Sequence, residues 1–462
     1  MAHIQRVNRR SFLQNAGLTA LAGAVGRPPV PLTATRGAEA GTGTPPADGR
    51  FDFDTVYPRF GTDCVKYDQQ IRIFGKGSVQ VGMGISDMDF RAAPCITKAL
   101  QARLGHENWG YLDMGATTPA MAESVAAWNR RRYGVTIDPS MLVFTNGVHP
   151  ALIFAIQALS PRGSKVLLTT PAYDGFYSDL VYTGTIAEES PMRLENGRYS
   201  VDYADFERRI SHETHTFILC NPHNPTGNCW SAEELTKIGE ICLRRRVVVL
   251  ADEIHCDFVS KGERYTPFAS LPNKDIVNNS LSFNAASKAF NLSAHKVGWF
   301  YSTNADLMAR VAPFARADLT TLGIVANRAA YAEGEEWLNQ VAAYIDGNRD
   351  FAASYIHDRI PTIKLTKPQA TFLCWLDVGE LMERIGATKR ADDYNRTKAP
   401  TESRRTPEEI LQRFVIERAK VHINPGSNYG KGGAGHMRMN IATPRKQLEL
   451  ALGNIAVAVK NL

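Results

Sequence analysis

The sequence lacks the features that mark several large classes of protein. It has seven cysteines but no C-x-x-C pair, so neither a zinc site nor a dithiol redox site is indicated. An odd number of cysteines also argues against a disulfide framework, and we expect most of these thiols to be buried apolar side chains. No apolar run is long enough to span a bilayer stably, and no internal repeat is present. No metal is therefore expected.

Excess charge of one sign is absent as well. The chain has 53 basic and 47 acidic residues, and the basic residues are scattered apart from short clusters at 130–132 and 244–246. We interpret these clusters as solvated helix ends, and we expect no nucleic-acid partner. The length of 462 residues and an apolar content of 44% predict two or three domains with a large core.

The N-terminus carries an export pattern. Arg9 and Arg10 precede a short apolar run rich in glycine and alanine, as in twin-arginine signals. The alternative is an ordinary basic start of a helix. Small residues at 22–24 and 38–40 are candidate cleavage sites, and the Pro/Thr/Gly-rich surroundings favour the second. We predict a signal peptide and linker at 1–40, and a soluble mature protein exported to the periplasm or beyond.

Strand and helix patterns alternate through the middle of the chain. Continuous apolar runs at 164–170, 214–221 and 246–253 are typical of buried strands, and helical patterns at 149–159 and 231–245 lie between them. This alternation predicts an α/β fold, with a mostly parallel central sheet and helices on both faces.

The C-terminal part has a different pattern. Extended apolar stretches at 370–378, 419–426 and 436–442 predict a smaller α+β domain. The polar insertion 389–409 contains proline, and we expect it to be a mobile loop. The predicted division is an arm at 41–88 that joins the small domain, a large domain at 89–328 and a small domain at 329–462.

Two lysines lie eight residues apart in a stretch of small residues at 284–300. A lysine among small side chains can lose its charge by desolvation and become a nucleophile that bonds to an aldehyde. A second lysine that stays charged can bind a phosphate. We predict the first role for Lys288, which follows Ser287, and the second for Lys296.

Three polar side chains lie at or just after the ends of buried strands, where ligands bind in open α/β sheets. Asn224 lies in the doubled Asn-Pro turn "CNPHNPTG", and Asp252 and His255 lie in "ADEIHCD". Asp252 could pair with a protonated pyridine nitrogen, and the alternatives are a salt bridge or a helix cap. For Asn224 the alternative is a purely structural turn.

An anion site and a stacking site are indicated nearby. In "TNGVHPAL" a glycine turn enters a helix, so Gly147, Val148 and His149 can offer free backbone amides to an anion. Plain helix capping is the alternative. Tyr173 follows a strand and could stack on a planar ring, unless it only packs within its loop.

Arg438 lies within an apolar strand pattern and therefore needs an anion. A substrate carboxylate held by two hydrogen bonds fits, and a buried structural ion pair is the alternative. The G-x-G-x-x-G spacing at 430–435 is not a dinucleotide motif, because a strand rather than a helix follows it.

In this order, these motifs resemble the fold-type I pyridoxal-phosphate enzymes, the aspartate aminotransferase superfamily, over essentially the whole mature chain. The resemblance is greatest to the MalY/PatB group of cystathionine β-lyase-like carbon–sulfur lyases. "RFGTDCVKYD" at 59–68 is similar to that group's R-x-G-T-x-x-x-K-W-D, and "GMGISDMDF" at 82–90 is similar to its M-W-V-A-D-M-D-F. Residues 109–128 agree too.

The resemblance implies pyridoxal 5'-phosphate as cofactor and a homodimer with shared active sites. It assigns catalysis to Lys288, Asp252 and Tyr111, of which Tyr111 reaches the phosphate of the neighbouring subunit. It assigns the substrate to Gly84, Ile85 and Arg438. The residues that it places around the cofactor are Gly147, Val148, His149, Tyr173, Asn224, Asp252, His255, Ser287, Lys288 and Lys296.

The chain departs from this pattern at several positions. Gly84 replaces a tryptophan and Ser86 an alanine beside the substrate pocket. Ala285 stands where relatives often have a phosphate-binding serine, and Lys296 where they often have arginine. A lysine is a point charge rather than a fork, so we expect a weaker grip on the phosphate. Export is also unusual for this mainly cytoplasmic group.

The resemblance implies β-elimination from an L-cysteine conjugate such as cystathionine, giving a keto acid, ammonia and a thiol. Transamination of an L-amino acid is the alternative, because the same residues serve both reactions. A non-catalytic exported binding protein is a third possibility, against which the intact Lys288, Asp252 and Arg438 argue.

Overall fold

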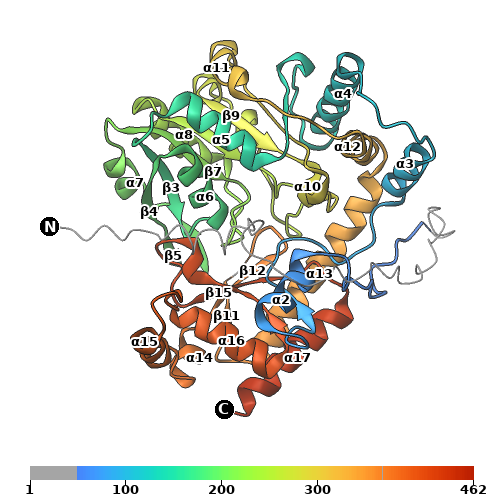
Figure 1. Ribbon diagram of the computed structural model, residues 1–462. Coiled ribbons are helices and arrows are strands. Elements are labelled where there is room, and N and C mark those ends of the chain that lie inside the picture. The colour runs from blue at the N-terminus through green and yellow to red at the C-terminus, as the bar shows by residue number, and fades with distance from the viewer. Residues whose placement is uncertain (1–48, 367) are drawn as a thin grey trace.

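A computed structural model of the chain describes residues 49–366 and 368–462 (Figure 1). The twin-arginine pattern and both candidate cleavage sites lie outside the described residues. Within these two ranges, no helix has the length and apolar character needed to cross a membrane.

A seven-stranded sheet forms the centre of the upper half of the molecule in Figure 1. Within it β10 is antiparallel to both of its neighbours, and the other strands run in one direction. In sheet order the strands are β2 (Val143–Thr145), β10 (Gly298–Tyr301), β9 (Ser280–Asn284), β8 (Val248–Asp252), β7 (Thr214–Cys220), β3 (Lys165–Thr170) and β4 (Ile186–Pro191). The strands predicted at 164–170, 214–221 and 246–253 are confirmed.

Helices cover both faces of this sheet. Along β7, Phe217 packs into the core beneath α8 (Ala232–Arg244), whereas Ile218 packs with α5 (Val148–Leu159) and α6 (Asp174–Thr183). Such alternation requires a covered layer on each side of the strand. The predicted α/β class is therefore confirmed, as are the helices predicted at 149–159 and 231–245.

A second, four-stranded sheet lies in the lower half. Its order is β11 (Lys364–Leu365), β12 (Leu373–Asp377), β15 (His436–Asn440) and β14 (Asn424–Pro425). The long helix α13 (Glu335–Arg359) connects the two halves, and α16 (Pro407–Ala419) packs on α17 (Arg445–Lys460) (Figure 1). The extended stretches predicted at 370–378, 419–426 and 436–442 thus contain strands; within the second, β14 and β13 (Val421–His422) are short.

The polar insertion is not the irregular loop that its composition predicts. Helix α15 (Ala387–Thr397) occupies its first half, because Ala391 is buried against the small-domain core. Asn395 then exchanges two hydrogen bonds with the backbone of Arg405, 2.8 and 2.7 Å long. The composition therefore reflects an amphipathic helix and an ordered turn.

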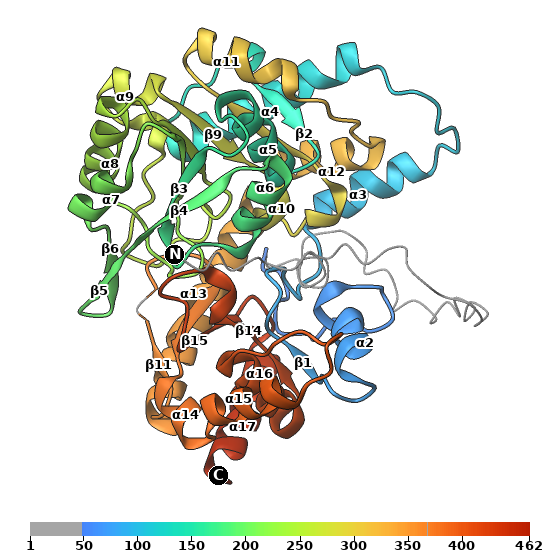
Figure 2. The ribbon, with the colours of Figure 1, turned by 60° about the vertical axis from the view of Figure 1, so that its left-hand side comes forward.

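The described part of the arm packs on the lower half. Strand β1 (Val81–Gly82) pairs in parallel with β13 (Val421–His422), and α2 (Gln70–Phe74) lies beside them (Figure 2). Residue 328 lies inside α12 (Thr321–Glu333), and the predicted domain boundaries stay predictions. The remaining helices and strands are α3 (Pro94–Leu104), α4 (Met114–Tyr133), β5 (Arg193–Glu195), β6 (Arg198–Ser200), α7 (Tyr203–Arg209), α9 (Lys274–Asn278), α10 (Ala286–Ala289), α11 (Ala305–Val311) and α14 (Gly379–Arg384).

Candidate active site

The turn into α5 has the geometry that an anion site requires. Gly147 is its N-cap with φ +122°, and the backbone of Gly298 in β10 passes so close that a Cβ there would lie 2.7 Å from the Gly147 carbonyl carbon. The first amides of α5, at Val148 and His149, have no partner within the helix. Lys296 is exposed, and its charge contributes to lowering the pKa of Lys288, so the two amines lie near each other.

The His149 side chain has contacts that the sequence analysis did not predict. Its Nδ1 lies 2.8 Å from a carboxylate oxygen of the buried Asp179, and its Nε2 lies 3.4 Å from the Tyr173 hydroxyl. Burial opposes the charged imidazole, but the Asp179 carboxylate outweighs it and raises the pKa of His149. Asp179 thus orients the imidazole, which packs beside the predicted stacking ring of Tyr173.

Lys288 lies in α10 and contacts the segment that carries the second resemblance marker. Its Nζ donates a hydrogen bond to the Ser86 carbonyl at 2.6 Å and lies 3.2 Å from the Ser86 hydroxyl. Burial, aided by the charge of Arg438, lowers the pKa of Lys288 from 10.5 to about 8. At pH 7 roughly one molecule in ten therefore carries this amine in its neutral, nucleophilic form, far more than for an ordinary lysine.

Asp252 is the last residue of β8 and His255 lies three residues further on, and both are buried. Burial raises the pKa of Asp252 to about 6, and no cationic side chain within the described residues forms an ion pair with it. His255 Nδ1 has no hydrogen-bond partner there, and burial with the charges of Lys288 and Arg438 keeps its pKa well below the ordinary value. Both groups can accept a ligand.

Arg438 is buried on β15. It donates to the Asn224 side-chain oxygen at 3.2 Å and to the Gly84 carbonyl at 2.8 Å, while its Nε has no hydrogen-bond partner among the described residues. Within 49–366 and 368–462 no carboxylate forms an ion pair with it, so the alternative of a structural ion pair is not present there. A buried guanidinium with free donors is suited to a carboxylate.

The two resemblance markers are joined by ion pairs, of which the one between Lys66 and Asp89 is buried. The Lys66 amine, fully buried, lies 2.7 Å from Asp89, and Arg59 lies 2.8 Å from Asp87 and 3.0 Å from Asp89. This network fixes the segment 84–89, whose carbonyls contact Arg438 and Lys288.

The packing around Gly84 explains one departure from the family pattern. A Cβ at this position would lie 2.4 Å from the His422 ring and 2.5 Å from the Asn424 side-chain oxygen. Asn424 lies directly opposite Arg438 across β14 and β15, so their side chains share a face. These two polar residues, which the sequence analysis did not single out, thus pack where a larger residue at 84 would extend.

The remaining predicted residues differ in position. Ser287 lies next to Lys288 in α10, and the Ile85 carbonyl accepts a hydrogen bond from Asn440 at 2.7 Å. Tyr111 is fully exposed before α4 and makes none of the contacts described above. Its role across a subunit boundary stays a prediction.

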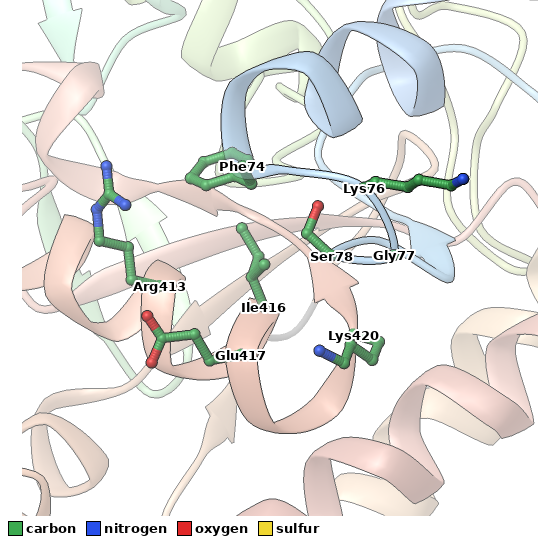
Figure 3. A pocket seen from close by; sticks show the side chains of 8 residues that line it. All are labelled: Phe74, Lys76, Gly77, Ser78, Arg413, Ile416, Glu417 and Lys420. Atoms are coloured by element: carbon green, nitrogen blue, oxygen red, sulfur yellow. The ribbon is translucent and has the colours of Figure 1, made fainter.

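A separate pocket of about 210 Å³ lies between the arm and α16 (Figure 3). It shares no residue with the groups around Lys288. Its lining residues are Phe74, Lys76, Gly77, Ser78, Arg413, Ile416, Glu417 and Lys420. The described ranges contain no cluster of side chains suited to a metal ion, and five of the seven cysteines are buried, as expected.

The unpaired groups fit pyridoxal phosphate. The start of α5 and Lys296 suit a phosphate, and Asp252 suits the protonated ring nitrogen. Lys288 suits the aldehyde, and His255 Nδ1 can take a polar ring substituent.

Comparisons with known proteins agree with this fit. The pattern of the family "Aminotransferase class I and II" matches residues 78–455. The chain is 34% identical to cystathionine beta-lyase PatB of Bacillus subtilis, over 88% of this chain and all of the relative. It is 30% identical to protein MalY of Escherichia coli, over 89% and 99% of the two chains.

A solved structure also matches over nearly its whole length. The pyridoxal-phosphate-bound C–S lyase from Staphylococcus hominis superimposes with a TM-score of 0.77 at 28% identity, covering 89% of this chain and 99% of the other. The chain therefore belongs to the class I and II aminotransferase family of pyridoxal-phosphate-dependent enzymes, close to the cystathionine β-lyase-like proteins PatB and MalY.

Proposed function

We propose that this chain is a carbon–sulfur β-lyase that acts on an L-cysteine conjugate such as cystathionine and releases a keto acid, ammonia and a thiol. One observation carries the proposal. The carbonyls of Gly84 and Ser86, two residues apart, contact Arg438 and Lys288 respectively. A substrate whose carboxylate binds Arg438 would therefore hold its Cα near the Lys288 amine. The names of PatB and the Staphylococcus enzyme support the sulfur-containing substrate.

Each residue has a distinct proposed role. Bound pyridoxal phosphate supplies an electron sink for the carbanion left when the Cα proton is removed. Lys288 takes that proton, and its lowered pKa keeps a neutral amine available near neutral pH. Arg438 and Asn224 orient the carboxylate, and Asp252 places a negative charge at the ring nitrogen.

The test uses the purified protein loaded with pyridoxal phosphate and supplied with L-cystathionine, without any keto-acid acceptor. We expect sustained release of pyruvate and ammonia. Arg438→Lys keeps the charge but loses the fork, and it should raise KM by about 100-fold. Conversion that stops after one turnover would contradict the lyase.

Transamination of an L-amino acid is the second candidate. The family pattern itself is that of aminotransferases, and Lys288, Asp252 and Arg438 serve both reactions up to proton removal. The two differ in where the proton next goes. Amino transfer to an added keto acid, with no net release of ammonia, would identify the aminotransferase.

We also propose export by the twin-arginine route to the periplasm and a homodimer. Arg9-Arg10 before a short apolar run supports export.

The homodimer is supported by the exposed aromatic side chains of Trp109 and Tyr111, which lie on one loop that a partner subunit could cover. Replacement of Arg9 and Arg10 by lysines should abolish export, and the mass in solution should be that of two chains. Tyr111→Phe should weaken cofactor binding.

A further inference from the structure

The segment 84–89 is held from three sides. Asn440 of β15 donates from its amide nitrogen to the carbonyls of Ile85 and Asp87, at 2.7 and 2.6 Å. The side chain of Asn291, just beyond α10, exchanges two hydrogen bonds of 2.9 and 3.0 Å with the segment's backbone. The ion pairs of the arm hold the third side. A residue in this segment has little freedom to move.

Ser86 is the residue of this segment that contacts the reactive amine. Its carbonyl accepts a hydrogen bond from Lys288 Nζ at 2.6 Å, and its hydroxyl oxygen lies 3.2 Å from the same nitrogen. The motif that residues 82–90 resemble has alanine at this position. Any residue at position 86 would supply the backbone carbonyl, so the hydroxyl is the group that serine adds there.

The hydroxyl differs chemically from the carbonyl. A carbonyl oxygen can only accept a hydrogen bond, so it binds an N–H of Lys288 whether the lysine is neutral or protonated. A hydroxyl accepts from an ammonium and can also donate to the lone pair of a neutral amine. Ser86 can therefore remain bonded to Lys288 before and after the lysine gains a proton.

We propose that Ser86 is a further catalytic residue, whose hydroxyl and carbonyl together hold the free amine of Lys288 while that amine takes and keeps the substrate's Cα proton. In this step the Cα–H bond breaks and the proton forms a new N–H bond on Nζ. The electron pair stays with the substrate joined to its cofactor. The inference rests on the proposed function only in requiring that Lys288 removes a Cα proton.

The experiment compares Ser86→Ala with Ser86→Thr, which keeps a hydroxyl, and with Ser293→Ala, the same change at an exposed serine nearby. The first readout is the pH dependence of the rate at which the cofactor-free protein takes up pyridoxal phosphate, because only the neutral amine reacts. Loss of the hydroxyl removes an acceptor from the ammonium, so the midpoint should fall in Ser86→Ala alone.

The second readout is exchange of the substrate's Cα proton in heavy water by the loaded protein. We expect a fall of about tenfold in Ser86→Ala, the effect of one hydrogen bond to a charged group, with near wild-type rates in the other two variants. Ser86→Ala that keeps both the wild-type midpoint and the wild-type exchange rate would overturn the proposal. Exchange precedes both elimination and transamination, so absence of pyruvate would contradict the β-lyase without obscuring this result.

Discussion

The two sides of the site are constructed in opposite ways. On the side of the seven-stranded sheet, Asp252, His255 and Lys288 lie at or shortly after the ends of strands and form no ion pair among the described residues. On the other side, the segment 84–89 is fixed by ion pairs from the arm and by hydrogen bonds from β15. The first side keeps these polar groups available to a ligand, whereas the other, Arg438 apart, uses its polar groups to hold backbone in place.

This difference predicts that residues on one side contribute mainly to catalysis and residues on the other mainly to folding. Unpaired buried groups cost stability in the free protein, so removing one should damage catalysis more than the fold. A buried ion pair leaves an uncompensated charge when one partner is removed, so its loss should damage the fold first. Variants on the two sides should therefore fail in different assays.

The largest effect is expected from Lys288→Ala. Without the amine, the protein loses both the covalent attachment of the cofactor and the base, so turnover should fall by about 10³-fold or more. The visible absorption of bound cofactor should change, while the unfolding transition of the cofactor-free protein should not weaken. Lys274→Ala, an exposed lysine of α9, is the matched control. Full turnover by Lys288→Ala would refute the assignment of the whole site.

Lys66→Met should show the reverse pattern. The Lys66 amine is fully buried against Asp89, so its removal should lower the free energy of unfolding by about 3–5 kcal/mol, measured in denaturant. Arg208→Met removes an exposed arginine from its pair with Asp205, which also pairs with Arg209, and should change the free energy of unfolding by about 1 kcal/mol or less. If Lys66→Met instead keeps normal stability but loses turnover, the ion pairs of Lys66 contribute to catalysis rather than to folding.

The sequence predicted one side of the comparison better than the other. Asp252, Asn224 and the start of α5 follow buried strands, and parallel strands bring their ends together whatever the rest of the chain does. The Lys66–Asp89 contact joins residues 23 apart, and the Ser86–Lys288 contact joins residues 202 apart. No local pattern encodes either contact.

Asp179 was missed for another reason. It lies on a helix as one acid among many, and only the packing of α5 on α6 places it against His149. The insertion 389–409 was misjudged because polar composition does not separate a loop from an amphipathic helix whose few buried residues suffice to dock it.

Gly84→Ala tests the side of the site on which the segment 84–89 is fixed, at the close contact between Gly84 and His422. The new Cβ would overlap the His422 ring, so stability should fall by about 1–3 kcal/mol. His422→Ala in the same chain should relieve part of that loss, and the double variant should be more stable than the sum of the two single changes predicts. Additive losses, measured by denaturant unfolding, would show that the ring is not the obstacle.

The smallest effect is expected from Asp179→Asn, on the side of the seven-stranded sheet. In the folded protein the Asp179 carboxylate raises the pKa of His149 above its ordinary value of 6.5. A raised folded pKa contributes stability that is complete below the unfolded pKa, near 6.5, and is lost as pH rises through the folded value. Asp179→Asn should remove this contribution, and the pKa of His149 measured by NMR titration should fall. The variant should be less stable than wild type at low pH, and this difference in the free energy of unfolding should shrink as pH increases. Asp358→Asn, at the exposed contact with His357, should change stability by about 0.5 kcal/mol or less. An unshifted His149 titration would mean that packing alone, and not the charge of Asp179, holds the pair together.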